Sequence, residues 1–461
     1  MNSQSKKMEL LGSASIPKAL LAMGIPTMIG MLVNAFYNLV DAYFVGGLGE
    51  SQMGAISVVY PLGQVVVGLG LLFGNGAASY ISRLLGRGDN ENADKVASTA
   101  LYSSISVGAV IIIISMIFLH PILKLLGATD SILPYAATYA GIYIVSCIFN
   151  VFNVTMNNIV TSEGAAKTTM CALLTGAALN IALDPLFIYV FDLGVAGAAI
   201  ATAISQVVST CVYLTYILRK KSVFHFRVKD CTYSKEIMSE IFKIGIPTLV
   251  FQILTSLSIS LINNAAGNYS DSAIAGMGVV TRLISMGSLS VFGFIKGFQP
   301  IAGYSYGAKK FDRLREAIKT SILWSTVFCV IFGLVLALFP TAIVSQFTKG
   351  DTEMIRIGAT SLRANGITIM LFGFYTVYSS LFLALGKGKE GFILGACRQG
   401  ICFIPVILLL PMVWGLNGIL YAQPIADVLS AIITVFMAIP LHKRLNEMQQ
   451  QIATISTNNK N

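Results

Sequence analysis

Three carboxylates stand inside stretches of the chain that are otherwise apolar, and they are the residues best suited to carry chemistry. Of the 21 acidic residues, only Asp41, Asp184 and Asp427 fall well inside such stretches. If the stretches cross a membrane, each carboxylate costs at least about 2.5–3.5 kcal/mol and requires compensation. Each is therefore a candidate for function, or else is held structurally by an arginine or by nearby backbone donors.

Two of these carboxylates are expected to lie at the same depth. Asp41 follows the start of its stretch by about 25 residues and Asp184 by about 18, which places both in the outer half at 1.5 Å per residue. Asn180 lies one helical turn from Asp184 and shares its face. Thr202, in the next stretch, has a similar depth. The four residues predict one polar pocket of two carboxylates, an amide and a hydroxyl.

Such a pocket suits a proton or a hard cation. No Lys or Arg in the first half of the chain lies at that depth. Two carboxylates in a low dielectric cannot both stay ionised at low cost, so one takes up a proton or a bound Na⁺ neutralises the pair. Oxygen ligands are the ones that hard cations prefer. We therefore predict cation coupling at Asp41, Asn180, Asp184 and Thr202, with H⁺ and Na⁺ both open and no cofactor.

The elements that must position these residues occur twice. The segment Gly24-Ile25-Pro26-Thr27 returns in the second half of the chain as Gly245-Ile246-Pro247-Thr248, and the same offset pairs Gly76 with Gly297. A constant offset over so much of the chain indicates two copies of one unit. Repeated halves in a membrane protein are typical of transporters, because two lobes can rock around a shared central site.

The composition requires lipid as the solvent. The chain is 55% hydrophobic and 11% charged, whereas soluble domains are roughly 25% charged. We predict an all-α integral membrane fold of twelve transmembrane helices in two pseudo-symmetric six-helix lobes, since each apolar segment can cross a hydrocarbon core of about 30 Å. The predicted spans are 16–44, 52–84, 93–119, 131–161, 166–190, 194–219, 237–266, 272–304, 312–341, 352–385, 391–413 and 417–441.

The basic residues predict the orientation. If the N-terminus is cytoplasmic, most of the 31 Lys and Arg residues fall on inner loops, helix ends and tails, as the positive-inside rule requires. Both termini are then cytoplasmic in a multi-pass protein of the cell membrane, and the net charge of +10 does not indicate nucleic-acid binding. The expected organisation is a cytoplasmic tail (1–15), an N-lobe (16–219), a cytoplasmic linker (220–236), a C-lobe (237–445) and a second cytoplasmic tail (446–461).

The second half carries different charges at membrane depth. Neither carboxylate of the predicted pocket has an acidic repeat partner. Arg282, Arg363 and Asp427 instead share a depth, about 10 residues from the outer ends of their segments. We expect Asp427 to pair with one of these arginines; the alternative is that the three line a substrate cleft. Lys296 lies deeper and is expected to extend toward the cytoplasmic water.

Pro26 occupies the first span, and Pro247 the matching place in the seventh. Proline removes a backbone hydrogen bond and permits a bend. The interpretation that bears on function is a hinge at Pro26 coupled to Asp41 on the same helix. The alternative is a static kink.

Several motifs resemble the multidrug and toxic compound extrusion (MATE) family, and most closely its DinF-like branch. They are GIPTMIGMLVNAFYNLVDAYFVGGLG, SRLLGRGDNENA, GYSYGAKKFDRLREA, LNIALDPLFIY and GVAGAAIATAIS. The resemblance covers about residues 10–445. It implies a V-shaped, twelve-helix antiporter that exports cationic or amphipathic drugs against H⁺ or Na⁺. It also implies a first-lobe cation site at Asp41, Asn180, Asp184 and Thr202. The other main branch has acidic residues in its seventh and tenth helices, where this chain has Asn263 and Asn264 in the seventh.

The leading interpretation is a cation-coupled antiporter that exports small amphipathic compounds by alternating access. It would be surrounded by membrane lipids and act as a monomer. A flippase for lipid-linked oligosaccharides is the first alternative, and the paired carboxylates disfavour it. An integral-membrane enzyme or a receptor is the alternative of another class. The sequence has only three His and no nucleophile constellation, so we expect no enzyme.

Overall fold

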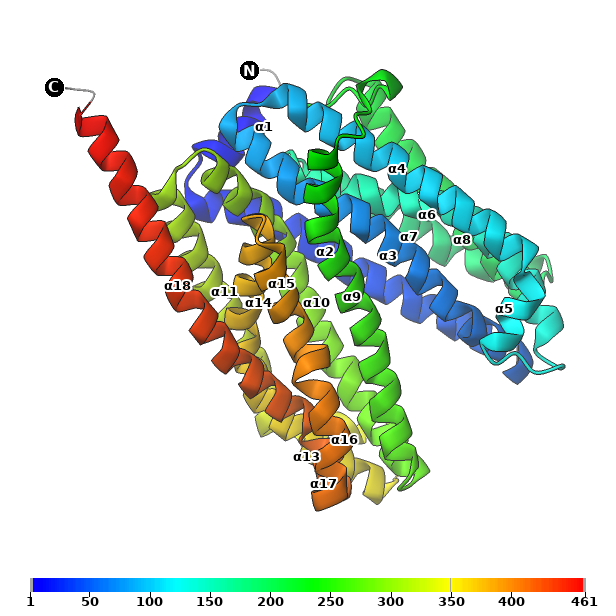
Figure 1. Cartoon of the computed structure of the whole chain (residues 1–461). Coiled ribbons are helices and arrows are strands. Elements are labelled where there is room, and N and C mark those ends of the chain that lie inside the picture. The colour runs from blue at the N-terminus through cyan, green and yellow to red at the C-terminus, as the bar shows by residue number, and fades with distance from the viewer. Residues whose placement is uncertain (1–2, 349, 459–461) are drawn as a thin grey trace.

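The chain folds into helices that form two lobes. The computed structural model describes residues 3–348 and 350–458, and every regular element in these ranges is helical. Twelve helical segments within them are long and apolar enough to cross a membrane, as predicted. Figure 1 shows the lobes in contact at the end that carries both termini and apart at the opposite end, so the molecule resembles a V. The predicted fold class is therefore confirmed.

The first lobe contains six spans in the expected order. They are preceded by a short helix within the predicted N-terminal tail. The elements are α1 (Ser3–Gly12), α2 (Ile16–Gly46), α3 (Glu50–Arg87), α4 (Asn90–Ile117), α5 (Leu119–Leu125), α6 (Leu133–Ser162), α7 (Ala166–Pro185) with a π-helical turn (Leu186–Val190), and α8 (Gly194–Leu218).

The second lobe repeats this plan with more interruptions. A short 3₁₀ turn (Val228–Asp230) lies in the segment between the lobes, and the tenth and eleventh spans are each built from more than one helix. The elements are α9 (Lys235–Gly267), α10 (Asp271–Gly307), α11 (Phe311–Leu338), α12 (Pro340–Ser345), α13 (Thr352–Thr368), a 3₁₀ turn (Ile369–Leu371), α14 (Phe372–Ala384), α15 (Gly388–Ala396), a π-helical turn (Cys397–Ile401), α16 (Phe403–Trp414), α17 (Leu416–Leu420) and α18 (Ala422–Asn458).

Short polar side chains fix where several spans begin. Asp89 starts α4 by accepting a hydrogen bond from the backbone N–H of Asn92, and Ser234 starts α9 by accepting one from Ile237. Such caps satisfy N–H groups that the first helical turn leaves without partners. At the end of α3, Gly88 adopts a left-handed conformation (φ 79°), which stops that helix before α4 begins.

Repeated glycines allow the two lobes to touch. A Cβ atom on Gly297 of α10 would clash with the backbone of Gly24 in α2, and one on Gly245 of α9 would clash with the backbone of Leu72 in α3. Gly24 and Gly245 are partners in the internal repeat. Small residues let helix backbones approach closely. Each copy of the repeat therefore contributes one helix to each of these two close contacts between the lobes.

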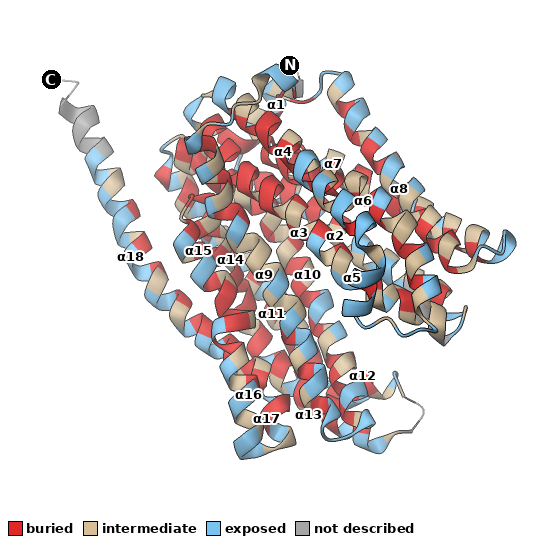
Figure 2. Cartoon of the chain, turned by 45° about the vertical axis from the view of Figure 1, so that its right-hand side comes forward, coloured by how far each residue is buried: buried red, intermediate tan, exposed pale blue. Residues whose placement is uncertain are grey.

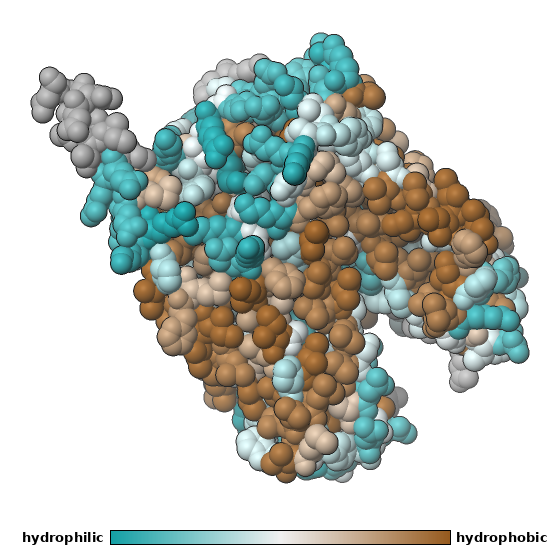
Figure 3. All heavy atoms as spheres, in the orientation of Figure 1, coloured by the Kyte–Doolittle hydropathy of each residue, from teal (hydrophilic) through white to brown (hydrophobic). Residues whose placement is uncertain are grey.

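The flanks of both lobes are apolar, and hydrophilic residues lie at the end that carries the termini and at the far tips of the lobes (Figure 3). Figure 3 shows hydrophobic residues over the flanks, hydrophilic residues gathered at that end, and a hollow between the lobes at the other end. Figure 2 shows exposed residues along α18, and these include Ile432, Val435 and Phe436. Because exposing so large a contiguous apolar surface to water is unfavourable, the flanks are suited to contact lipid.

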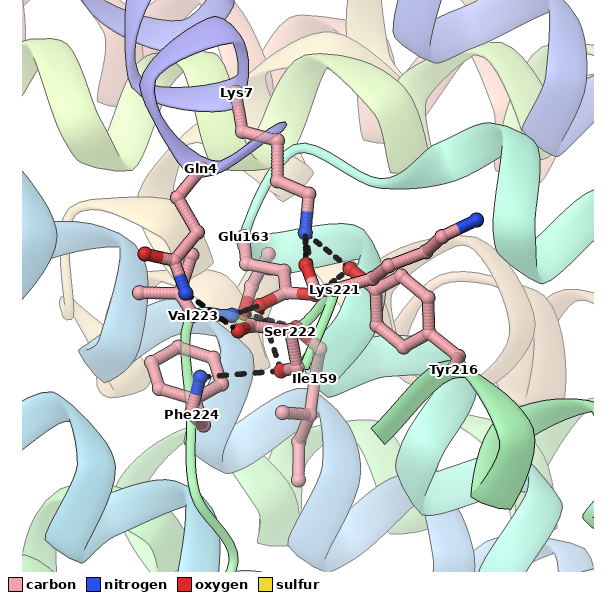
Figure 4. A network of polar contacts seen from close by, with 10 residues as sticks. Gln4, Lys7, Ile159, Glu163, Tyr216, Lys221, Ser222, Val223 and Phe224 are labelled. Carbon is pink, nitrogen blue, oxygen red and sulfur yellow. Dashed lines mark hydrogen bonds and ion pairs between the residues drawn. The ribbon is translucent and has the colours of Figure 1, made fainter. Parts of the chain in front are cut away.

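The first helix, α1, joins a buried polar network at the end that carries the termini (Figure 4). Lys7 forms an ion pair with Glu163 (Nζ–Oε1 3.2 Å) and also donates to the hydroxyl of Tyr216. Glu163 accepts further hydrogen bonds from Ser222 Oγ (3.0 Å) and the backbone N–H of Val223 (2.7 Å). Burial lowers the pKa of the Lys7 ammonium, and the Glu163 carboxylate acts in the opposite direction.

The same helix also contacts the second lobe. Lys310 donates a hydrogen bond to the carbonyl of Gly12 (2.7 Å), and Arg313 donates one to the carbonyl of Leu11 (Nε–O 3.2 Å). The residues expected to form a polar tail, 1–15, thus include a helix that bridges the two lobes.

Candidate functional site

Three helices of the first lobe bring the four predicted pocket residues together. Asp41 lies on α2, Asn180 and Asp184 on α7, and Thr202 on α8. Asn180 Nδ2 donates to Asp184 Oδ1 (3.3 Å) and reaches Thr202 Oγ1 at 3.5 Å, the limit of a hydrogen bond. The carboxyl group of Asp41 lies within electrostatic range of that of Asp184, since α2 packs against α7. The structure therefore assembles the amide, the hydroxyl and both carboxylates in one place.

The pocket contains buried oxygen atoms that lack hydrogen-bond donors. Asp41 Oδ1, Asp184 Oδ2 and Asn180 Oδ1 are buried and have no hydrogen-bond partner among the residues that the structure describes. Neither carboxylate takes part in an ion pair within these residues. Buried acceptors are normally satisfied, so three orphaned ones in one pocket require an explanation. A proton on one carboxylate or a small cation held between the oxygens would satisfy them.

The local backbone explains how α7 presents Asp184. Pro185 follows it directly and has no N–H to continue the α-helical pattern, and the π-helical turn Leu186–Val190 begins there. Such turns insert an extra residue and are frequent at functional sites. The helix therefore changes its winding where the carboxylate points into the lobe.

Two tyrosines that the sequence analysis did not single out lie near this pocket. Tyr37 of α2 lies within electrostatic range of both carboxylates, and Tyr139 of α6 within range of Asp41. Tyr37 precedes Asp41 by one helical turn, a spacing that places both on one face. That spacing is the signal by which Tyr37 could have been found. No comparable signal exists for Tyr139, because it comes from a distant helix.

The buried carboxylate of the second lobe has a different partner from the expected one. Asp427 Oδ1 accepts hydrogen bonds from Arg398 Nε (2.8 Å) and Gln423 Nε2 (2.8 Å), and the Arg398 guanidinium lies over the ring of Phe372 at 4.6 Å. Asp427 and Arg398 are both buried. An ion pair is present as predicted, but the predicted choice between Arg282 and Arg363 was wrong.

The reason for this correction is geometric. Arg282 and Arg363 are both exposed, so they lie on the surface of the lobe although their depth matches that of Asp427. Arg398 lies in the π-helical turn Cys397–Ile401 in the interior of the eleventh span. Counting residues from a helix end gives depth and does not tell which way a side chain points.

The fold and the pocket together define a class of protein. Two duplicated six-span lobes meet at one end and separate at the other, and one lobe encloses an acidic pocket. This is the architecture of a two-lobed membrane transporter. The sequence profile of the MatE family matches residues 26–186 and 247–409. The two matched blocks begin at Pro26 and Pro247, which are partners in the internal repeat.

The chain belongs to the MatE family and is not an enzyme. It is 32% identical over 429 residues to the multidrug export protein MepA of Staphylococcus aureus, covering 93% of this chain and 94% of MepA. It is also similar to a structure described as the outward-facing conformation of a multidrug resistance MATE family transporter of the MOP superfamily (TM-score 0.90, 26% identity, 96% of this chain and 99% of that one). A structure described as MATE in the bent conformation matches with a TM-score of 0.89 and 26% identity, covering 97% and 99%. Membership of the MATE family is therefore confirmed, and the assignment to its DinF-like branch stays a prediction.

Proposed function

We propose that the chain is a cation-coupled antiporter that exports amphipathic and cationic drugs from the cytoplasm by alternating access. The three orphaned oxygens of the first-lobe pocket carry this proposal, because they form a site that a proton or Na⁺ would fill. The relatives named multidrug export proteins support the class of substrate. Coupling requires the pocket to bias an equilibrium between two conformations of the lobes.

The helix α2 is the element that can transmit occupancy of the pocket. It carries Asp41 toward one end, and toward the other it packs against α10 of the second lobe. Thr27 Oγ1 donates a hydrogen bond to the carbonyl of Gly293 across that contact (2.6 Å). A cation or proton bound at Asp41 and Asp184 would therefore act on a helix that also forms the joint between the lobes.

The positive-inside rule gives the direction of transport in this proposal. The lobes meet at the end that carries the termini, and the basic residues assign that end to the cytoplasm. An ion pair between Arg83 of α3 and Glu240 of α9 (2.6 Å) joins the lobes there. The conformation is accordingly the one that opens to the outside, where a drug is released and a cation enters.

Drug flux in vesicles tests the proposal. Purified protein is reconstituted in vesicles, and transport of ethidium is followed under a pH gradient, under a Na⁺ gradient and under neither. We expect flux with at least one gradient, and which gradient works identifies the coupling ion. Equal flux in all three conditions would contradict coupling, and no flux in any condition would contradict drug transport.

The substitution Pro26→Ala tests whether α2 acts as a hinge. Pro26 lies in the part of α2 that contacts the second lobe, beside Thr27. Proline costs about 3 kcal/mol in a helix interior, so alanine should favour a straight helix. We expect weaker drug efflux, with cation binding at Asp41 and Asp184 retained. Spin labels on the outer ends of α2 and α7 would report the motion as distances at low and high pH, with and without Na⁺.

The repeat supplies the control for this experiment. Pro247 has the matching place in α9, but the sequence gives the second lobe no carboxylates at the places that correspond to Asp41 and Asp184. Pro247→Ala should leave the cation-dependent change in the distances of the first lobe intact. If the unsubstituted protein shows the same distances under all conditions, Pro26 is a static kink.

A further inference from the structure

Lys296 of α10 is a membrane-depth cation whose side chain reaches into the opposite lobe. It was expected to extend toward water. Instead its ammonium donates a hydrogen bond to Asn157 Oδ1 of α6. Within the described residues, no carboxylate lies at ion-pair distance from it. A neutral amide oxygen accepts the hydrogen bond but leaves the positive charge without compensation, which is costly in a low dielectric.

The ammonium lies on a small polar cavity between the lobes. In this conformation the cavity has room for about one water molecule. Gln299 also lines it, and Gln299 Nε2 is a buried donor without an acceptor in the part of the chain that the structure describes. The first lobe contributes Ser82, Asn158 and Thr161. Two residues of the second lobe that carry donor groups, one of them charged, thus line a cavity to which no described carboxylate contributes.

The repeat shows that the architecture does not require this cavity. The repeat partner of Lys296 is Asn75, whose Nδ2 donates to Thr248 Oγ1 across the other joint (2.8 Å). The partner of Gln299 is Ala78, and the partner of Asn157 is Tyr378. A neutral amide is therefore sufficient to join the lobes at one contact. Lys296, at the corresponding place in α10, bonds α6 instead and carries a charge, which calls for a separate reason.

We propose that Lys296 and Gln299 form a subsite for a carboxylate carried by the exported compound. The carboxylate would enter when the lobes separate at the end that carries the termini, because the cavity between the closed lobes is too small to hold it. One oxygen would replace Asn157 Oδ1 on the ammonium, and the other would accept from Gln299 Nε2. Hydrogen bonds between ionised partners are roughly twice as strong as neutral ones, and the pair would also neutralise the charge. This inference rests on the proposed export function and assigns the residues that would bind a carboxylate of the exported compound.

A matched pair of probes tests the subsite. A rhodamine with a free carboxylate and the methyl ester of the same rhodamine differ only at the group that Lys296 would bind. Their affinities for purified protein are measured by fluorescence anisotropy in neutral detergent, which excludes lipid phosphate as a competing anion. We expect Lys296→Gln to lower the ratio of acid affinity to ester affinity about tenfold, the size of a hydrogen bond to a charged group. Lys296→Arg should largely restore that ratio.

Controls separate recognition from folding. Lys18 lies exposed on the first turn of α2, and Lys18→Gln should leave the affinity ratio unchanged. Gln299→Ala keeps the charge and should lower the ratio by a smaller factor, which maintains a test if Lys296→Gln fails to fold. An unchanged ratio in both Lys296→Gln and Gln299→Ala would overturn the subsite, and so would an equal loss of both probes. Ethidium flux in vesicles is measured separately, so a failure of drug transport is distinguishable from a failure of carboxylate recognition.

Discussion

Asp41→Asn and Asp184→Asn are each expected to reduce drug efflux to the level seen without a cation gradient, while expression and folding stay close to normal. Each substitution keeps the size of the side chain and removes the charge that a proton or Na⁺ would neutralise. The two carboxyl groups lie within electrostatic range of each other and have no ion-pair partner among the described residues, so the proposed site needs both charges. Removing either carboxylate charge should therefore abolish the gradient-driven part of drug efflux, and should not merely halve it.

Gradient-driven ethidium flux in vesicles and thermal stability in detergent measure these two effects. Asp130 lies exposed between α5 and α6, so Asp130→Asn is the matched control and should transport normally. Normal gradient-driven flux by Asp41→Asn or Asp184→Asn would remove that residue from the coupling site. A large loss of thermal stability would instead assign it a structural role.

Asp427→Asn is expected to lower the free energy of unfolding by about 3–5 kcal/mol, because it leaves the buried Arg398 guanidinium without its counter-charge. Arg398→Met should cost a similar amount by leaving the carboxylate unpaired. The double variant should lose less than either single variant, since it leaves no isolated charge in the interior. Thermal or denaturant unfolding in detergent gives the three values for comparison.

Arg363→Met serves as the control, because Arg363 has the same expected depth but an exposed side chain. It should change stability by no more than about 0.5 kcal/mol. The competing hypothesis, in which Asp427 lines a substrate cleft, makes the opposite prediction. It would be supported if Asp427→Asn left stability unchanged and altered which drugs are exported.

The overall architecture could be predicted because its signals lie along the chain. The constant offset between the two copies of the repeat needs only the sequence, and the two blocks that match the MatE family begin at the same separation. The spans follow from the length of apolar runs. The interruption of the tenth span at Ile369–Leu371 left no such signal, because the sequence stays apolar through it.

The proximity of the pocket residues could be predicted for a similar reason. Asn180 and Asp184 share a helix face, and depth along α2 places Asp41 beside them. Partners that depend on the direction of a side chain could not be obtained in this way. Arg398 turns inward at a π-helical turn, and Lys296 crosses to the opposite lobe, so both contacts depend on how helices rotate and pack.

The contacts of α1 impose an order on the biogenesis of the protein. Its bond to Arg313 joins residues 302 positions apart, and its contact with Glu163 spans 156. At about 5–20 residues per second, Arg313 leaves the ribosome roughly 15–60 s after α1 does. During synthesis, α1 can therefore contact the first lobe before Lys310 and Arg313 of the second lobe have been made. A nascent chain arrested before Lys310 would keep the contact of α1 with Glu163 and would lack its hydrogen bonds with Lys310 and Arg313.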